Sequence, residues 1–214
     1  MTTWAIVVAA GRGTRFGGAK QYEPLGGRRV LDWSLEAARS SAEGVVVVVA
    51  PERAGSVEPA ADVVVAGGAT RSESVRRGLA AVPDDATVVV VHDAARPLAR
   101  PALFATVVEA VVAGADGAVP GVAVTDTIKR IDPTGRVLET PDRASLVAVQ
   151  TPQAFAAAAL RSAHAGGGEA TDDAALVEGA GGRVVVVAGD PDNRKLTDPG
   201  DLAAAEAHLA GGRG

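Results

Sequence analysis

An apolar run at residues 4–10, which leads into a glycine-rich loop at residues 11–20, constrains this chain more than any other stretch. The run is typical of a buried strand in a parallel sheet, and such strands open at their carboxyl ends onto ligand sites. Glycines in the loop let backbone N–H groups approach phosphate oxygens, because no Cβ is in the way. The segment therefore predicts a phosphate site at a sheet edge, with Arg15 and Lys20 as the positive charges.

The spacing within the loop excludes the two most familiar phosphate-binding motifs. A P-loop requires Gly-Lys followed by Ser or Thr, whereas Lys20 follows Ala19 and precedes Gln21. The dinucleotide fingerprint G-x-G-x-x-G requires a glycine where this chain has Phe16. A flexible surface turn after the strand remains the alternative for this segment taken alone.

Composition and charge restrict the class of partner. Lys and Arg number 21 against 26 Asp and Glu, and only 3% of residues are aromatic, which disfavours nucleic acid. Cysteine is absent, so disulfides, thiolate catalysis and cysteine-ligated metals are excluded. No basic stretch precedes the first apolar run and no run approaches membrane-spanning length, so we expect no membrane partner and a cytoplasmic location.

Strands and helices alternate along most of the chain. This alternation predicts right-handed βαβ crossovers and a Rossmann-like α/β fold, a mostly parallel sheet with helices on both faces. We find no linker and expect residues 1–214 to form a single domain. The predicted strands after the first are residues 45–49, 63–65, 88–91 and 184–188, and the predicted helices are residues 30–38, 70–82, 101–113, 155–165, 171–178 and 202–209.

Residues 122–147 break the alternation. Short runs of alternating character flank the turn sequence Asp-Pro-Thr-Gly at residues 132–135, which predicts an antiparallel hairpin. Such a hairpin is too small to hold a core of its own, so we expect an arm that projects and packs against a second subunit. A hairpin folded back on its own sheet is the alternative.

Charged residues follow several of the predicted strands. Arg15 and Lys20 follow the first strand, Asp93 and Arg96 follow residues 88–91, and Lys195 follows the last strand. A carboxylate among cations at a phosphate site is suited to hold Mg²⁺, which makes Asp93 the candidate ligand. Its alternatives are a strand-end cap or an ion pair with Arg96.

The three histidines do not suggest a catalytic relay. His92, at the end of an apolar strand, is predicted to be packed and hydrogen-bonded, while His164 and His208 lie on predicted helices and are expected to be exposed. Neither a Ser–His–Asp relay nor a metal-binding histidine spacing is visible. Chemistry at this site would then depend on a nucleophile in the substrate, such as a phosphate oxygen that attacks a nucleotide phosphate.

Seven motifs in register extend this interpretation. The chain, from Ala5 to Leu209, resembles the 2-C-methyl-D-erythritol 4-phosphate cytidylyltransferase family, with a nucleotide-diphospho-sugar transferase type of fold. That resemblance implies transfer of CMP from CTP to 2-C-methyl-D-erythritol 4-phosphate, with release of pyrophosphate, in the non-mevalonate isoprenoid pathway. The motifs are AAGRGTRFGGAKQY, GGATRSESV, VHDAARP, TDTIKR, PDRASLVAVQTPQAF, ATDDAALVE and DNRKLTDP.

The resemblance assigns roles to the charged residues. It implies that Arg15 and Lys20 contact the triphosphate and that Lys195 joins them in stabilising charge on the α-phosphate. It also implies that Asp93 binds Mg²⁺ and approaches the ribose together with Ala94.

The resemblance also implies how each substrate is recognised. Cytosine would be read by Ala10, Gly11, Gly68 and the Ser74 hydroxyl. Ala69 departs from the acidic residue that some relatives carry beside the base, which removes a side-chain contribution there.

The acceptor phosphate would lie among residues of two subunits. The resemblance places Arg96, Thr151 and Thr171 around it, and it implies that Thr127 and Arg143 reach in from the partner's arm. Both the hairpin pattern and the resemblance therefore favour a homodimer.

Two other functions compete. One is a ribitol 5-phosphate cytidylyltransferase of the same superfamily, which shares the nucleotide half and differs in the acceptor half. The other is a non-catalytic nucleotide-binding domain, which leaves the set of Arg15, Lys20, Asp93 and Lys195 unexplained.

Overall fold

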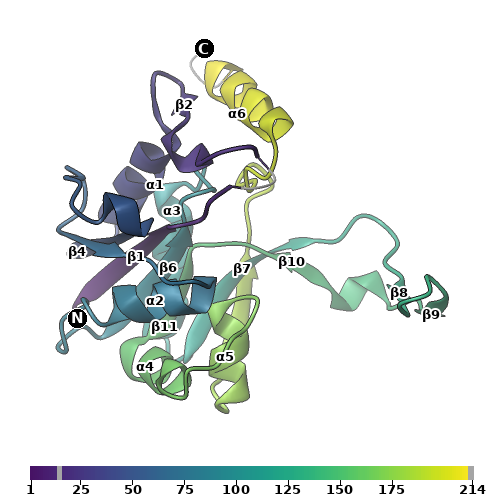
Figure 1. Ribbon diagram of the computed structural model, residues 1–214. Coiled ribbons are helices and arrows are strands. Elements are labelled where there is room, and N and C mark those ends of the chain that lie inside the picture. Colours follow the sequence, from purple (N-terminus) through teal and green to yellow (C-terminus); the bar gives the residue numbers. More distant parts are fainter. Residues whose placement is uncertain (14–15, 212–214) are drawn as a thin grey trace.

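An eight-stranded sheet with helices on both faces forms the body of the protein (Figure 1). The computed structural model describes residues 1–13 and 16–211. In space the strands follow the order β10-β7-β11-β6-β1-β4-β5, and β12 also pairs with β7. Their bounds are β1 (Thr3–Ala9), β4 (Gly44–Val49), β5 (Val63–Ala66), β6 (Val88–Asp93), β7 (Gly117–Ala123), β10 (Val147–Val149), β11 (Gln153–Ala156) and β12 (Val184–Ala188).

Most strand pairs in the sheet are parallel, as the alternation of strands and helices predicts. β1 pairs in parallel with β4 and β6, and the β4–β5 and β7–β12 pairs are also parallel. β11 runs antiparallel to both β6 and β7. The predicted start of a helix at residue 155 is therefore wrong. Residues 153–156 fill the space between two strands, and a short buried apolar run of this kind suits a strand as well as a helix.

Five helices cover the two faces of the sheet (Figure 1). On one face, α1 (Val30–Arg39) and α3 (Pro101–Val112) contribute Leu31, Leu35 and Phe104 to the core. On the other face lie α2 (Arg71–Leu79), α4 (Ala157–Ala165) and α5 (Asp173–Gly179). Because both faces are covered, β4 is buried along its whole length, which explains its uninterrupted run of valines.

The last helix brings the end of the chain beside its start. α6 (Pro199–Gly211) packs on a small hairpin of β2 (Pro24–Leu25) and β3 (Arg28–Arg29). A separate apolar cluster of Leu25, Val30, Leu196 and Ala205 holds these parts together. The segment that carries Lys195 is thereby fixed next to the loop that follows β1.

Residues between β7 and β10 extend away from the body as an arm (Figure 1). Within the arm, β8 (Arg130–Ile131) pairs antiparallel with β9 (Val137–Glu139), and a 3₁₀ turn, η3, spans Arg143–Ser145. Ile131, Val137 and Leu138 are each at least 50% exposed. The arm therefore presents apolar side chains to solvent, and its role in dimerisation stays a prediction.

Among the described residues, no helix has both the length and the apolar character needed to cross a lipid bilayer.

Candidate active site

A pocket of about 860 Å³ opens at the carboxyl ends of β1, β4, β5 and β6. It is lined by five stretches that are distant in sequence: the loop after β1, the residues after β4, the turn after β5 with the start of α2, the end of β6 and the segment after β12. Arg15 lies outside the described residues. The pocket brings together eight residues that the sequence predicts for the site: Ala10, Gly11, Lys20, Gly68, Ser74, Asp93, Ala94 and Lys195.

The glycine-rich loop is held in place by a buried glutamine. Gln21 lies in a 3₁₀ turn, η1 (Lys20–Tyr22), and its Nε2 donates to the carbonyl oxygens of Ala9 at 2.7 Å and Gly11 at 3.0 Å. Gly13 has φ +62°, and a Cβ there would lie 1.7 Å from the Gly18 carbonyl oxygen. A residue with a side chain therefore does not fit at this turn. The sequence pattern alone assigns no role to Gln21.

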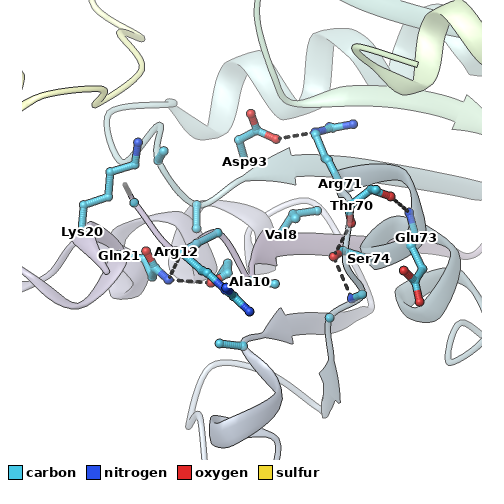
Figure 2. A pocket seen from close by; sticks show the side chains of 18 of the residues that line it. Val8, Ala10, Arg12, Lys20, Gln21, Thr70, Arg71, Glu73, Ser74 and Asp93 are labelled. Atoms are coloured by element: carbon cyan, nitrogen blue, oxygen red, sulfur yellow. Dashed lines mark hydrogen bonds and ion pairs between the residues drawn. The ribbon is translucent and has the colours of Figure 1, made fainter. Parts of the chain in front are cut away.

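The two lysines approach the pocket from opposite ends of the chain. Lys20 Nζ donates to the carbonyl oxygen of Leu196, and Leu196 N donates to the carbonyl oxygen of Ala95 at 2.8 Å. Lys195 Nζ lies 2.6 Å from Asp93 Oδ2. In Figure 2, Lys20 lies to the left of Asp93, and Arg71 contacts Asp93 from the right. These contacts place both ammonium groups at one rim.

Asp93 ends β6 and is held between two cations. Arg71 Nε lies 3.1 Å from its Oδ1, and Lys195 binds its Oδ2. Burial favours the neutral carboxyl, yet Arg71 and Lys195 hold the pKa of Asp93 well below its usual range. The group is therefore a carboxylate at neutral pH. The sequence left an ion pair between Asp93 and Arg96 as an alternative, but Asp93 pairs with Arg71 and Lys195 instead.

His92 is a packed residue, as predicted. It is 0% exposed; its Nδ1 lies 3.2 Å from Thr151 Oγ1 and its Nε2 lies 3.2 Å from the Arg96 carbonyl oxygen. Burial lowers the pKa of His92 to about 4, so the ring is neutral at pH 7. Thr151 Oγ1 also accepts a hydrogen bond from Asp93 N at 3.0 Å. Thr151 thus fixes the backbone N–H of Asp93, and His92 in turn contacts Thr151.

The turn after β5 forms the inner end of the pocket. A Cβ at Gly67 would lie 2.3 Å from Ala10 Cβ, so the two backbones meet closely here. Ser74 Oγ accepts from Gly68 N at 3.0 Å and donates to the Thr70 carbonyl oxygen at 2.8 Å (Figure 2). The Ser74 hydroxyl keeps one lone pair for a further donor.

Glu73 and Arg77 secure the same turn. Thr70 is the N-cap of α2 and accepts from Glu73 N at 3.1 Å, which is one half of a capping box. The Glu73 carboxylate accepts from Ala69 N at 2.8 Å, and Arg77 Nη1 donates to the Gly67 carbonyl oxygen at 2.8 Å. An acidic side chain therefore lies beside the turn even though position 69 is alanine.

A smaller hollow of about 360 Å³ lies beside the pocket, and Lys195 lines both. Arg96 lines this hollow, where its Nη1 donates to the Asn193 carbonyl oxygen at 2.7 Å. Within residues 1–13 and 16–211, the buried Nε of Arg96 has no hydrogen-bond partner. Arg96 thus retains a donor beside the hollow.

Three predicted residues lie elsewhere. Thr127 and Arg143 belong to the arm, where Arg143 Nη1 donates to the Thr125 carbonyl oxygen at 2.6 Å, and Thr171 is exposed before α5. In the described part of the chain, neither hollow is lined by any of these three or by Thr151. Their roles stay predictions.

One histidine differs from expectation. His208 is exposed as predicted, but His164 is only 3% exposed, with its Nε2 3.0 Å from Asp173 Oδ1. The prediction for His164 is wrong because α4 turns this residue toward α5.

Arg71 belongs to the site although the sequence pattern did not single it out. It is the first residue of α2, separated from the Gly-Gly pair only by Ala69 and Thr70, so it lies at the same sheet edge as Asp93. A search for charge after every predicted strand, the third included, would have found it.

Known proteins are similar to this chain over nearly its whole length. The family model of 2-C-methyl-D-erythritol 4-phosphate cytidylyltransferase matches residues 3–211. A protein of that name from Rhodococcus jostii is 47% identical and covers 95% of this chain, which spans 93% of that relative. The crystal structure of such an enzyme from Thermus thermophilus is 39% identical, covers 98% of this chain and 100% of its own, and has a TM-score of 0.82.

Some relatives are longer. A bifunctional enzyme IspD/IspF from Clavibacter michiganensis is 48% identical over 96% of this chain, and the chain spans 54% of its length. This chain thus corresponds to about half the length of that relative. The motifs, the shared sheet and the matched length lead to one assignment: this chain belongs to the 2-C-methyl-D-erythritol 4-phosphate cytidylyltransferase family.

Proposed function

We propose that the chain transfers CMP from CTP to 2-C-methyl-D-erythritol 4-phosphate, giving 4-diphosphocytidyl-2-C-methyl-D-erythritol and pyrophosphate. The observation that carries this proposal is the meeting of Lys20, Asp93 and Lys195 around one pocket beside a glycine-rich loop. The names of the family model and of the Rhodococcus relative support the choice of substrates.

The reaction needs no nucleophile from the protein. An oxygen of the acceptor phosphate attacks the α-phosphorus of CTP and forms a new P–O bond. The bond between that phosphorus and the bridging oxygen breaks, and its electron pair leaves with pyrophosphate. Such transfers depend on positioning and on charge stabilisation.

The two lysines supply that stabilisation. Lys20 lies in the loop whose backbone would surround the triphosphate, and Lys195 lines both the pocket and the smaller hollow. A cation between the pocket and the smaller hollow can stabilise the negative charge that develops where the donor and acceptor phosphates meet. Arg15, in the same loop, is proposed to add a third charge.

Asp93 is suited to hold a magnesium ion. Its carboxylate is ionised, and the group on its Oδ2 is the ammonium of Lys195, a side chain that is 40% exposed. Among the described residues no three acidic or histidine side chains cluster as a metal site, so further ligands would be phosphate oxygens and water, as Mg²⁺ prefers. Bound there, the ion would neutralise charge on the triphosphate.

The base and ribose are proposed to occupy the inner part of the pocket. Backbone groups of Ala10, Gly11 and Gly68 and the Ser74 hydroxyl would read the edge of cytosine, and Ala94 would lie near the ribose. All of these residues line the pocket. Recognition through hydrogen bonds agrees with a chain that is only 3% aromatic.

The acceptor is proposed to bind in the smaller hollow. Arg96 carries an unpaired Nε–H there, within the described residues, and Lys195 connects the hollow to the pocket. Thr171 and Thr151 would lie on its border, and Thr127 and Arg143 would enter from a partner subunit. The exposed apolar residues of the arm support a homodimer, because such a surface is usually covered.

The competing functions find less support. Neither the family model nor the relatives and solved structures described above carry the name of a ribitol 5-phosphate enzyme. A non-catalytic domain would not require two lysines and an aspartate at one pocket.

The test is an assay of pyrophosphate release with CTP and each polyol phosphate in turn. We expect turnover with 2-C-methyl-D-erythritol 4-phosphate and a much lower kcat/KM with ribitol 5-phosphate. Preference for ribitol 5-phosphate would replace the proposed acceptor, and no turnover with either would refute the proposal.

A further inference from the structure

A chain of side-chain contacts extends from the pocket into the protein. It begins with Lys195 and Asp93, continues through Arg71 to Asp173, and ends at His164. Arg71 Nη1 lies 2.8 Å from Asp173 Oδ2, and the other oxygen of Asp173 lies 3.0 Å from His164 Nε2. The proposed reaction assigns no role to the last three members.

Arg71 has the geometry of a fixed support. Its side chain is 24% exposed and bridges two carboxylates that come from different elements, Asp93 at the end of β6 and Asp173 at the start of α5. Burial alone would lower the pKa of Arg71, but the two carboxylates raise it, so the guanidinium stays charged. A planar guanidinium can hold two acceptors at once in a defined geometry, which a lysine cannot.

The two oxygens of Asp93 therefore have different surroundings. Oδ1 meets Arg71, which is tied to α5 and cannot move without breaking a second ion pair. Oδ2 meets Lys195, a flexible and partly exposed side chain that would turn to phosphate when the substrates bind. Oδ1 is thus anchored by Arg71, whereas Oδ2 can exchange Lys195 for another partner.

We propose that Arg71 is a positioning residue that anchors Oδ1 of Asp93, so that Oδ2 stays aimed into the pocket for an exchangeable partner. This inference rests on the proposed function, because the exchange partner is taken to be the nucleotide with its divalent ion. Asp173 sets the position of Arg71 from the far side. This chain of contacts thus connects α5, which begins just after Thr171, with the carboxylate proposed to receive the nucleotide.

The experiment compares Arg71→Met and Arg71→Lys with a matched control on the same helix. Arg76 also projects from α2, where it pairs with Glu169 at 2.9 Å and donates to the Gly168 carbonyl oxygen at 2.8 Å. Within the described part of the chain, neither Arg76 nor these two partners line the pocket. CTP binding in the presence of Mg²⁺ is measured by calorimetry without acceptor, and kcat and KM are measured separately.

Arg71→Met is expected to weaken CTP binding about tenfold or more and to lower kcat by about a hundredfold, because a misplaced ligand group costs that order of rate. Arg71→Lys is expected to restore part of the loss, and Arg76→Met is expected to match the wild type. Equal effects in Arg71→Met and Arg76→Met would overturn the proposal, since both remove an ion pair of α2.

A double-mutant cycle tests whether Arg71 acts through Asp93. In the Asp93→Asn background, Arg71→Met is expected to add no further loss of CTP binding, whereas additive losses would show an independent role. If Arg71→Met does not fold, Asp173→Asn takes its place, since it removes only the far anchor. Wild-type protein that neither binds CTP nor turns over refutes the proposed function instead, whatever the variants do.

Discussion

Lys195 Nζ lies 2.6 Å from Asp93 Oδ2, although the two residues are 102 positions apart in the sequence. The contact joins the end of β6 to the segment after β12 and closes the pocket on one side. It also means that the proposed catalytic cation, Lys195, would stay paired with a carboxylate until a triphosphate competes for it. Substrate binding would therefore release Lys195 from Asp93.

Loss of either lysine should impair the chemical step. Lys20→Ala and Lys195→Ala are each expected to lower kcat by about 10²–10³-fold, the usual effect of removing one preorganised charge donor. Arg39→Ala is the control, because Arg39 pairs with Asp62 away from the residues that line the pocket. Steady-state kinetics at saturating CTP provide the measurement, and a wild-type kcat in either lysine variant would contradict a role for that lysine in stabilising the transition state.

The neutral state of His92 predicts how stability depends on pH. Burial lowers the pKa of His92 from 6.5 to about 4, so between these values the unfolded chain binds a proton that the folded chain does not. The contribution of His92 is thus fully present above 6.5 and is lost as the pH falls toward 4, by at most about 1.4 kcal/mol per pH unit.

Urea unfolding across that pH range would measure this effect. The difference in free energy of unfolding between the wild type and His92→Asn is expected to shrink as the pH falls. His208→Asn, which alters an exposed histidine, is expected to keep the wild-type slope. A difference between wild type and His92→Asn that stays constant with pH would show that the ring is not kept neutral by burial.

Most of the parallel strands can be predicted from the sequence because each contains a run rich in valine and alanine, as burial on both faces requires. β7 is not among the predicted strands, because Pro120 and Gly121 interrupt its apolar run. Residues 153–156 cannot be assigned in the same way, since three buried residues and one partly buried residue carry no distinguishing period. Asp93 and Lys195 can be found because they follow strands. The ion pairs of Arg71 and the burial of His164 cannot, because both depend on helix packing that no local pattern encodes.

Adding even one methyl group at Gly67 should impair CTP binding. A Cβ there would lie 2.3 Å from Ala10 Cβ, so Gly67→Ala must push apart the loop after β1 and the turn after β5. We expect a raised KM for CTP with a smaller change in KM for the acceptor. Gly55→Ala, where a Cβ meets nothing within 4 Å, is the matched control. Unchanged CTP kinetics in Gly67→Ala would place the base elsewhere.

The arm's apolar side chains should matter for assembly. Ile131→Glu puts a charge on a side chain that is 57% exposed in the single chain, and it is expected to shift the protein toward monomer by sedimentation velocity. Activity should fall with the loss of dimer. Val57→Glu alters a more exposed side chain, at 86%, outside the arm and should leave assembly unchanged. A dimer that withstands Ile131→Glu would mean that another surface joins the subunits.

Mixed dimers can decide whether the arm serves its own pocket or that of its partner. Arg143→Ala is expected to weaken binding of the acceptor phosphate and to leave CTP affinity unchanged, and Lys195→Ala disables the pocket. If Arg143 crosses to the other subunit, a dimer of one Arg143→Ala chain and one Lys195→Ala chain has one site with both defects and one intact site. At acceptor concentrations where neither variant alone is active, co-expression of the two chains should then restore turnover. If the arm instead folds over its own pocket, every site in the mixed dimer keeps one defect, and co-expression recovers nothing.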